Sequence, residues 1–346
     1  MKHVLITGGA GFIGSHLCDT FIARGYAVTA IDNFLTGKIS NLDRVIKNPH
    51  FDFLKWDVCE PIPVQKVRFL SEFGLQGILH FACPPSPVDF EKIPFEILKV
   101  DSLGTINTVD LAIQYSARYL LASTSEVYGD PLEHPQTETY FGNVNSVGPR
   151  ACYDEAKRFS EAYVSTSMRG LGLYRSKKYK PLNAAIVRIF NTYGPRMRQD
   201  DGRVIPEFCT QALRGGELPV CGDGSQTRSL CFVSDLVEGI VRLFEGNVHK
   251  PVNIGNPDER SVFEMARFIS ELVYKMTGVS SKIKFVPARP EDPRKRKPNT
   301  DLAQKLLGWK PNVSLTEGLK MTILSMQNLI ARPLAHEAPF KIQKAL

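Results

Sequence analysis

A glycine-rich turn near the N-terminus constrains the fold of this chain more than any other feature. Gly8, Gly11 and Gly14 follow the short apolar run 3–7 and precede the helical run 15–23. The first glycine permits a tight turn, the second lets backbone approach a diphosphate, and the third lets the helix pack closely on the strand. The helix N-terminus then favours the phosphate charge. Strand, spacing and helix together predict a dinucleotide site rather than a glycine turn without a ligand.

An acidic residue follows the next apolar run and predicts which dinucleotide binds. The run 27–31 ends in Asp32, 18 residues after Gly14. A carboxylate there can accept hydrogen bonds from both adenosine ribose hydroxyls, and it would repel a 2′-phosphate. The sequence therefore favours NAD over NADP, although Lys38 nearby weakens the preference slightly. Further along, Asp57 and Val58 follow the third apolar run, where a side chain and an amide could meet the adenine.

The first half of the chain alternates apolar runs with helical stretches. This order is typical of an α/β fold with a doubly wound parallel sheet of the Rossmann type. We expect an NAD-binding Rossmann domain over residues 1–165, to which a later strand returns. The predicted strands are 3–7, 27–31, 51–54, 77–81, 118–123 and 184–190.

The pattern after residue 190 is richer in helices and turns. Helical periodicity covers 204–213, 233–244 and 261–277. We expect 191–330 to form mainly a smaller, C-terminal substrate-binding lobe. Residues 331–346 have no strong pattern and are expected to form a loosely packed tail.

Two segments between the predicted strands carry residues for hydride-transfer chemistry. The first is 123–129, with the sequence STSEVYG, and the second is 153–157, with the sequence YDEAK. Residues four apart share one helix face. Tyr153 could act as general base on an alcohol, Lys157 could lower its pKa and hold the cofactor ribose, and a hydroxyl from the first segment could bind the same alcohol oxygen. A lone Tyr-x-x-x-Lys also arises on solvated helices, so the upstream dinucleotide motif decides the interpretation.

The net charge of +7 raises the question of an acidic partner. Basic residues gather at 175–180 and 294–297, which could indicate a nucleic-acid surface. The aromatic residues of a base-stacking surface are nearly absent, since only Tyr179 lies within these runs. We interpret both runs first as solvated faces and second as attraction for an anionic nucleotide substrate. No nucleic-acid partner is expected.

Composition favours an enzyme of the cytoplasm. The seven cysteines form no Cys-x-x-Cys pair and no Cys/His cluster, so we expect reduced thiols and no metal site. No apolar run approaches the roughly 20 residues needed to span a bilayer. No signal peptide precedes the first predicted strand, so we expect no membrane association.

The motifs taken together resemble the extended short-chain dehydrogenases/reductases, and among them the UDP-glucuronate decarboxylases (UDP-xylose synthases). The resemblance covers roughly residues 1–325, and its stretches GPRACYDE and RKRKP are much more specific than the glycine turn. The matching segments are 7–14, 32–37, 123–131, 134–136, 148–155, 188–196, 201–204, 226–228, 253–257, 292–298 and 307–309.

This resemblance implies a reaction. Oxidation of the sugar C4 hydroxyl by NAD⁺ places a ketone β to the C6 carboxylate, CO₂ leaves, and re-reduction at C4 gives UDP-xylose without net redox change. Tyr153 would be the base, Lys157 its electrostatic partner and Thr124 the hydroxyl donor. Glu126 would protonate C5 after CO₂ leaves, directly or through water. Arg228 would contact the substrate carboxylate or the diphosphate.

The resemblance also implies a set of binding residues and a homodimer. For NAD, these are Gly8, Gly11, Phe12, Ile13, Gly14, Asp32, Asn33, Thr36, Gly37, Asp57, Val58, Ala82, Lys99, Tyr153 and Lys157. For the UDP-sugar, they are Ser125, Asn191, Arg203 and Arg228.

Three alternative functions stay open from the sequence. A 4,6-dehydratase carries an aspartate where Ser125 stands, and serine is a poor acid. A nucleotide-sugar 4-epimerase would use the same Thr124, Tyr153 and Lys157 but release no CO₂. A non-catalytic NAD-sensing scaffold commonly lacks the tyrosine or the lysine.

The chain departs from the family pattern at three places. Asp101 stands where the family usually has asparagine, and Phe90 stands where an aromatic hydroxyl is common. The segment 168–183 is longer than expected and carries basic residues. These differences could alter the sugar accepted without changing the cofactor.

Overall fold

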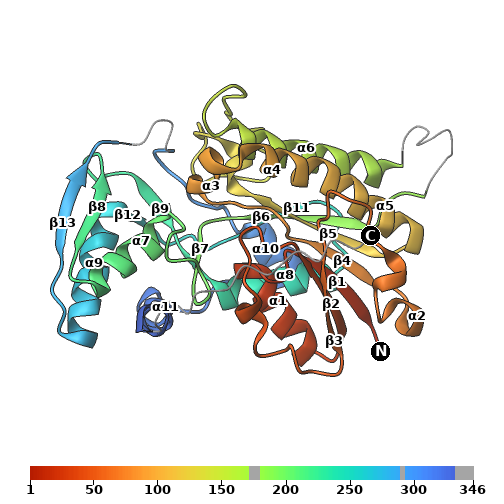
Figure 1. Ribbon diagram of the computed structural model, residues 1–346. Helices are drawn as coiled ribbons and strands as arrows, with labels where there is room; N and C mark the ends of the chain where they lie inside the picture. The colour runs from red at the N-terminus through yellow and green to blue at the C-terminus, as the bar shows by residue number, and fades with distance from the viewer. Residues whose placement is uncertain (171–179, 289–292, 332–346) are drawn as a thin grey trace.

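A seven-stranded parallel sheet forms the centre of the molecule (Figure 1). The computed structural model describes residues 1–170, 180–288 and 293–331. Neighbouring strands follow the order β3-β2-β1-β4-β5-β6-β11, and every pair is parallel. The strands are β1 His3–Thr7, β2 Ala27–Asp32, β3 Phe51–Lys55, β4 Gly77–His80, β5 Arg118–Thr124, β6 Ala184–Ile189 and β11 Pro251–Ile254.

The predicted fold class, a doubly wound α/β sheet, is confirmed. The six predicted strands are present, each ending within one residue of its expected range. The seventh strand, β11, and helix α8 (Val233–Glu245) come from 191–330, the segment expected to be mainly substrate lobe. β11 pairs with β6, and α8 packs on α1 and β6. The four residues Pro-Val-Asn-Ile of β11 are too short and mixed to give a strand pattern.

Helices cover both faces of the sheet, as its fully buried strands require. In β1, Val4 and Ile6 pack into the core shared with α1 and α8, whereas Leu5 packs into the core shared with α5 and α6. Figure 1 shows these two helical layers above and below the strands. The helices around the sheet are α1 Phe12–Ala23, α4 Pro94–Lys99, α5 Thr105–Tyr115, α6 Ala151–Arg169, α8 and α10 Asp301–Leu307.

The second lobe lies beyond the carboxyl ends of the central strands (Figure 1). It contains short sheets, in which β8 pairs with β13, β9 with β12, and β7 with β10. Its strands are β7 Thr192–Tyr193, β8 Glu217–Cys221, β9 Thr227–Ser229, β10 Cys231–Phe232, β12 Glu259–Ser261 and β13 Lys282–Val286. Its helices are α7 Val204–Leu213, α9 Val262–Thr277 and α11 Leu315–Ala331. The helical ranges predicted at 204–213, 233–244 and 261–277 are present as α7, α8 and α9, whereas α11 has no predicted counterpart.

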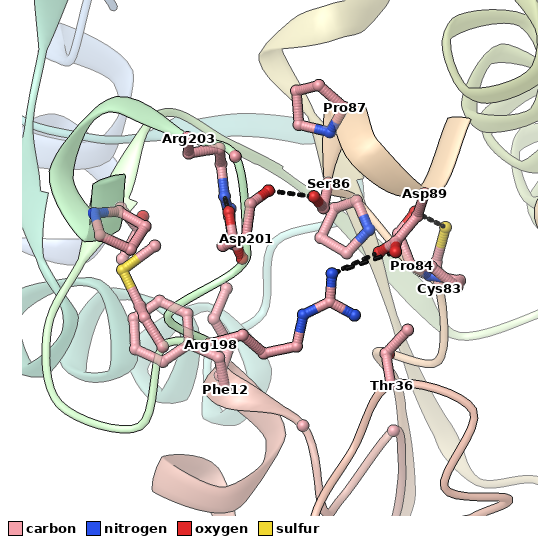
Figure 2. A pocket seen from close by; sticks show the side chains of 18 of the residues that line it. Phe12, Thr36, Cys83, Pro84, Ser86, Pro87, Asp89, Arg198, Asp201 and Arg203 are labelled. Atoms are coloured by element: carbon pink, nitrogen blue, oxygen red, sulfur yellow. Dashed lines mark hydrogen bonds and ion pairs between the residues drawn. The ribbon is translucent and has the colours of Figure 1, made fainter. Parts of the chain in front are cut away.

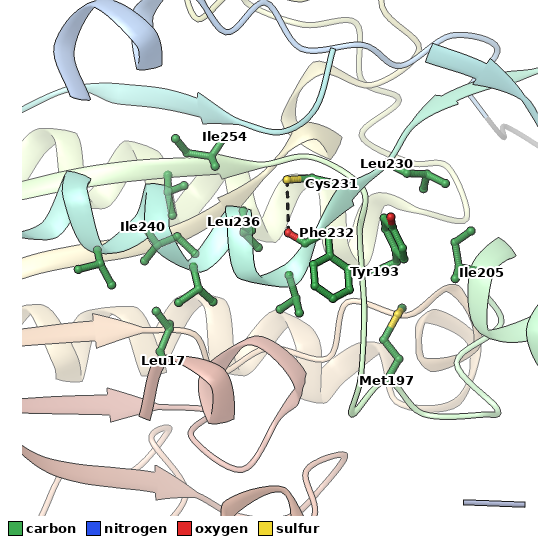
Figure 3. Close-up of a cluster of buried hydrophobic side chains, with 14 of the residues drawn as sticks. Leu17, Tyr193, Met197, Ile205, Leu230, Cys231, Phe232, Leu236, Ile240 and Ile254 are labelled. Carbon is green, nitrogen blue, oxygen red and sulfur yellow. Dashed lines mark hydrogen bonds between the residues drawn. The ribbon is translucent and has the colours of Figure 1, made fainter. Parts of the chain in front are cut away.

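One hydrophobic core joins the lobe to the sheet (Figure 3). It runs from Leu17 on α1 through Ile240 and Phe232 to Ile205 on α7, and these side chains are buried. Since close-packed cores resist relative movement of their parts, this contact fixes where the lobe faces the ends of the strands.

Short helical turns complete the described chain. They are η1 Ile39–Leu42, η2 Val64–Lys66, α2 Leu70–Phe73, α3 Pro87–Lys92, the π-helical turn η3 Val100–Gly104 and η4 Ser125–Tyr128. None of the helices in the described ranges is both long and apolar enough to cross a membrane. Residues 332–346 of the predicted tail and 171–179 of the long basic segment lie outside the described residues.

Candidate active site

A large pocket of about 1410 Å³ opens between the carboxyl ends of the sheet strands and the second lobe. This edge is where doubly wound sheets bind their ligands. The pocket extends from the glycine turn along β2 and β4 to Tyr153 and on to the lobe residues around Arg228. Every binding or catalytic residue predicted from the sequence lines it except Gly37.

The glycine turn is packed so tightly that side chains would not fit. A Cβ on Gly8 would lie 2.6 Å from the Phe81 carbonyl oxygen, and Gly8 has a φ of +67° that disfavours other residues. A Cβ on Gly14 would lie 2.1 Å from the Gly8 oxygen. Gly11 donates its N–H to that same oxygen at 3.0 Å. The turn therefore presents bare backbone to the pocket at the start of α1, the arrangement that a diphosphate needs.

Asp32 ends β2 with its carboxylate held beside the turn. The Ala10 and Phe34 N–H groups donate to its two oxygens at 3.0 and 2.8 Å. Burial raises the pKa of Asp32, although these two hydrogen bonds oppose the rise. A Cβ on Gly37 would lie 2.9 Å from both carboxylate oxygens, so Gly37 acts as the floor under Asp32 rather than as pocket wall.

The next part of the pocket wall is formed by polar groups after β2 and β3. Asn33 donates to Asp57 at 3.2 Å, and the Cys59 N–H donates to the other Asp57 oxygen at 2.9 Å. Burial opposes ionisation of Asp57, but the hydrogen bonds from Cys59 and Asn33 and the charge of Lys99 lower its pKa. The glycine turn, the Asp32 carboxylate and the polar groups around Asp57 together fit an adenine dinucleotide.

The predicted catalytic residues meet at the far end of this channel. Tyr153 and Lys157 lie on one face of α6, with the Lys157 Nζ 5.9 Å from the Tyr153 ring centroid. Thr124 ends β5 and hydrogen-bonds to the Tyr153 side chain. Burial raises the pKa of Tyr153, and the Lys157 ammonium and the Thr124 hydroxyl oppose that rise. Phe90 stacks on the Tyr153 ring, with the centroids 5.1 Å apart.

Lys157 is anchored by an ion pair with Asp101. Its Nζ lies 2.8 Å from Asp101 Oδ1 and donates to the Ala122 carbonyl at 3.0 Å. Both charged side chains are at least 95% buried. Burial alone would lower the pKa of Lys157, but Asp101 raises it above its ordinary value.

Glu126 lies on the η4 turn, directly after Thr124 and Ser125, and two arginines from other segments hold its carboxylate between them. Arg150 and Arg296 each donate to one of its carboxylate oxygens. Burial opposes ionisation, but the charges of Arg296, Arg150 and Arg228 outweigh it and lower the pKa of Glu126 to about 2. Such a carboxylate stays ionised at neutral pH, so of the two expected routes, direct protonation of C5 and protonation through water, the geometry favours the one through water.

Arg296 was missed as a site residue because it belongs to the basic run 294–297. The expectation of a solvated face is wrong for this residue. The Arg296 side chain is 3% exposed, and it donates to the Gly129 carbonyl at 3.0 Å as well as to Glu126. Arg294 and Lys295 beside it are exposed. The only sequence signal was the position of Arg296 within the family-specific stretch RKRKP.

Asp154 is a further buried carboxyl group behind this clamp. Its Oδ2 lies 3.6 Å from Arg150 Nε, and its Oδ1 is buried without a hydrogen-bond partner among the described residues. Burial and the Glu126 charge raise the pKa of Asp154 to about 7, although Arg150 opposes the rise. The sequence gave no indication of this environment.

The predicted substrate residues surround the same space. Ser125 is 2% exposed and precedes Glu126. Asn191 leaves its buried side-chain oxygen without a partner among the described residues. Arg228 lies on β9 and donates to the Thr227 and Pro293 carbonyls, each at 2.8 Å. The open amide oxygen of Asn191 is a group that a ligand could satisfy.

Arg203 lines the pocket beside Asp201 and Ser86, where the second lobe meets the domain that contains the central sheet (Figure 2). It pairs with Asp201, whose backbone carbonyl accepts from Ser86. Arg198 on the same loop donates to both oxygens of Asp89 at 3.0 and 3.1 Å. These contacts connect the loop before α7 to the segment after β4 across the pocket.

Comparison with known proteins identifies the family. The family described as GDP-mannose 4,6 dehydratase matches residues 5–322. UDP-glucuronic acid decarboxylase 4 of Arabidopsis thaliana is 47% identical over 320 residues, which are 92% of this chain and 67% of the relative. The chain belongs to the extended short-chain dehydrogenase/reductase family, among the UDP-glucuronic acid decarboxylases. UDP-glucuronic acid decarboxylase 1 of Xenopus tropicalis, another member, is 44% identical over 97% of this chain and 74% of its own.

Solved structures of the extended family share the fold. UDP-glucose 4-epimerase from Thermotoga maritima superposes with a TM-score of 0.81 and 28% identity, covering 95% of this chain and all of the epimerase. UDP-glucuronic acid 4-epimerase from Bacillus cereus, in complex with UDP-glucuronic acid and NAD, gives 0.81 and 25% identity over 95% of this chain and 100% of that chain. The dTDP-glucose 4,6-dehydratase from Bacillus anthracis, in complex with NAD, gives 0.78 and 25% over 95% and 97%.

Proposed function

We propose that this chain decarboxylates UDP-glucuronate to UDP-xylose with NAD as a retained cofactor. One observation carries the proposal: a Thr124–Tyr153–Lys157 group faces the same pocket as a Glu126 carboxylate clamped by two arginines. The first group suits oxidation of an alcohol, and the second provides charges at the point where a carboxylated sugar would lie. The decarboxylase relatives, 44–47% identical over most of the chain, support this choice.

NAD is proposed to bind along the glycine turn, with its diphosphate on the backbone of Gly11 to Gly14 and its adenosine ribose on Asp32. Thr36, Asp57 and Val58 would border the adenosine, whereas Ala82 and Lys99 would border the path to Tyr153. When bound, NAD⁺ supplies reversible oxidation of the sugar C4 hydroxyl to a ketone, which activates the C6 carboxylate for loss as CO₂.

Tyr153 is proposed as the base that takes the C4 hydroxyl proton. Thr124 would hold the same oxygen through its hydroxyl, so the phenolate and the alcohol stay in line. The Lys157 ammonium, held by Asp101 and the Ala122 carbonyl, would stabilise the phenolate by its charge and would donate to the cofactor ribose. After CO₂ leaves, Tyr153 would return its proton to the C4 oxygen.

The carboxylate end is proposed to act through fixed charges. When the C5–C6 bond breaks, its electron pair moves toward the C4 ketone and C5 must gain a proton. Glu126 would orient the water that supplies this proton, because an ionised carboxylate accepts hydrogen bonds. Arg228 would hold the substrate carboxylate or diphosphate, and Ser125, Asn191 and Arg203 would position the nucleotide-sugar.

Product analysis tests the proposed function. Incubation with UDP-glucuronate should yield UDP-xylose and CO₂ without stoichiometric consumption of added NAD⁺. Formation of the C4 epimer without CO₂ would favour the epimerase, which shares Tyr153 and Lys157. A 4,6-dehydratase is disfavoured because Ser125 stands where its acid is needed, and binding of NAD without any turnover would favour a sensing scaffold.

We also propose a division of labour, an assembly and a location. Residues 1–165 with 184–190 would bind NAD, and 191–330 would mainly bind the sugar nucleotide.

A homodimer is supported by apolar side chains exposed on neighbouring helices α4 and α6, namely Phe95, Leu98 and Phe159. Mass measurement by light scattering, with Phe95→Glu as the disruptive variant, tests it. A cytoplasmic location is supported by the seven free cysteines, and fractionation tests it.

A further inference from the structure

The buried ion pair between Asp101 and Lys157 joins two neighbouring layers of the active site. Asp101 lies on the π-helical turn η3, between α4 and α5, whereas Lys157 lies on α6. Single π-helical turns cost hydrogen-bond regularity and are frequent at functional sites. The Ser160 hydroxyl donates to the Asp101 carbonyl at 2.6 Å and bonds to Thr105 at 3.1 Å, which ties the turn to α6.

We propose that Asp101 is a positioning residue for Lys157: its carboxylate fixes the ammonium group in one orientation and offsets the positive charge that Lys157 presents to Tyr153. The proposal rests on the proposed function only where turnover is measured. The 2.8 Å contact and the near-complete burial of both side chains carry it. A fixed charge pair of this kind is only weakly screened by solvent.

The remaining groups around the pair do not replace this carboxylate. The Cys83 thiol, after β4, donates to the other Asp101 oxygen at 3.0 Å, and its pKa lies well above the ordinary value because it is buried. His80 on β4 is neutral, since burial and Lys157 lower its pKa to about 3. Tyr119 on β5 is a buried neutral phenol, and Arg203 before α7 is paired with Asp201.

Loss of the Asp101 charge should therefore make Tyr153 ionise more readily. The Asp101 charge opposes phenolate formation at Tyr153 and also raises the pKa of Lys157. Its loss lowers both pKa values, and we expect Lys157 to keep its proton on the acidic side of the profile, where the ammonium still stabilises the phenolate. In Asp101→Asn, Lys157 keeps a polar neighbour but loses the anion. The acidic limb of the pH profile of kcat should then move to lower pH by about one unit or more. Asp101→Glu keeps the charge and should leave the limb near its parent position.

Thr105→Val is the matched control, because it disturbs the same turn through its contact with Ser160 without changing charge. It should leave the acidic limb in place even if it lowers kcat or thermal stability. If Asp101→Asn does not fold, Asp101→Ser provides the neutral variant. A folded neutral variant with lower kcat but an unmoved acidic limb would overturn the proposal and leave Asp101 as a merely structural residue.

A second measurement does not depend on turnover. Protein labelled with carbon-13 at tyrosine Cζ is titrated by NMR with NAD bound and without substrate, and Tyr153→Phe assigns the Tyr153 resonance. The resonance should titrate at lower pH in Asp101→Asn than in the parent protein and in Thr105→Val. Equal titration in all three would overturn the proposal. If the shift occurs while UDP-glucuronate is not converted, the proposed function fails and the role of Asp101 stands.

Discussion

The two ends of the pocket are built in different ways. The cofactor end is formed by segments adjacent in sequence: a strand, its glycine turn and helix, and the next strand with Asp32. At the substrate end, Glu126 meets Arg150 and Arg296, which lie 24 and 170 residues away along the chain. The first end is encoded locally and follows from spacing rules. The second exists only once the lobe has folded against the sheet, and it is the end that distinguishes one sugar-nucleotide reaction from another.

The largest expected effect lies where the two ends meet. Tyr153→Phe keeps the ring stacked on Phe90 but removes the base, so turnover should fall by on the order of 10²–10⁴. Folding and NAD binding should be retained. Steady-state kinetics and calorimetry check both expectations.

Tyr163→Phe is the control for this variant. It removes a phenol from the same helix at a position outside the pocket, where the ring stacks on Phe159. Its turnover should equal that of the parent. Near-normal activity of Tyr153→Phe would refute the assignment of the base.

Arg296→Ala tests the substrate end of the pocket. It leaves the buried Glu126 with one charged partner fewer, and breaking such a pair costs about 3–5 kcal/mol. We expect turnover to fall roughly 100-fold and the free energy of unfolding to decrease. Kinetics and chemical denaturation measure the two effects.

Lys295→Ala is the matched control, since Lys295 belongs to the same basic run but is exposed. It should behave like the parent protein. If both variants lose activity equally, the basic run acts as a whole through its net charge, and the specific role of Arg296 is wrong.

Asp32→Ala tests the cofactor end of the pocket. The carboxylate would face the 2′-phosphate of NADP, and like charges brought together cost several kcal/mol. The parent should therefore prefer NAD strongly, and the variant should lose roughly tenfold or more of that preference. Calorimetric titration of both cofactors into the apo-protein measures it, and equal affinities in the parent would contradict the role of Asp32.

These variants also separate what the sequence could predict from what it could not. The sheet, the helices after residue 203 and the Tyr153–Lys157 face follow from periodicity and spacing, which are local properties. β11 did not, because a four-residue strand with a central asparagine carries no pattern. The burial of Arg296 and Asp154 could not be predicted either, because it depends on contacts with residues that are distant in the sequence.

The smallest expected effect on turnover is at Asp154, where the predicted change is in the pH dependence of stability. Its pKa is raised to about 7 in the folded protein, whereas an unfolded aspartate titrates near 4. Ionisation therefore costs the folded state stability, and the loss grows as pH rises from about 4 to about 7. Asp154→Asn should gain thermal stability relative to the parent across this window and hold the gain above it. Calorimetry at pH 5 and pH 8 compares the two, and an unchanged difference would contradict the buried neutral carboxyl.

The central claim is that the substrate end of the pocket directs the reaction to loss of the C6 carboxylate as CO₂. The most direct measurement uses UDP-glucuronate labelled with carbon-13 at C6, incubated with the protein in deuterated water and followed by NMR. The account predicts that the label leaves as CO₂ and that the UDP-xylose formed carries solvent deuterium at C5 but none at C4. A six-carbon product that retains the label, without deuterium at C5, would contradict it.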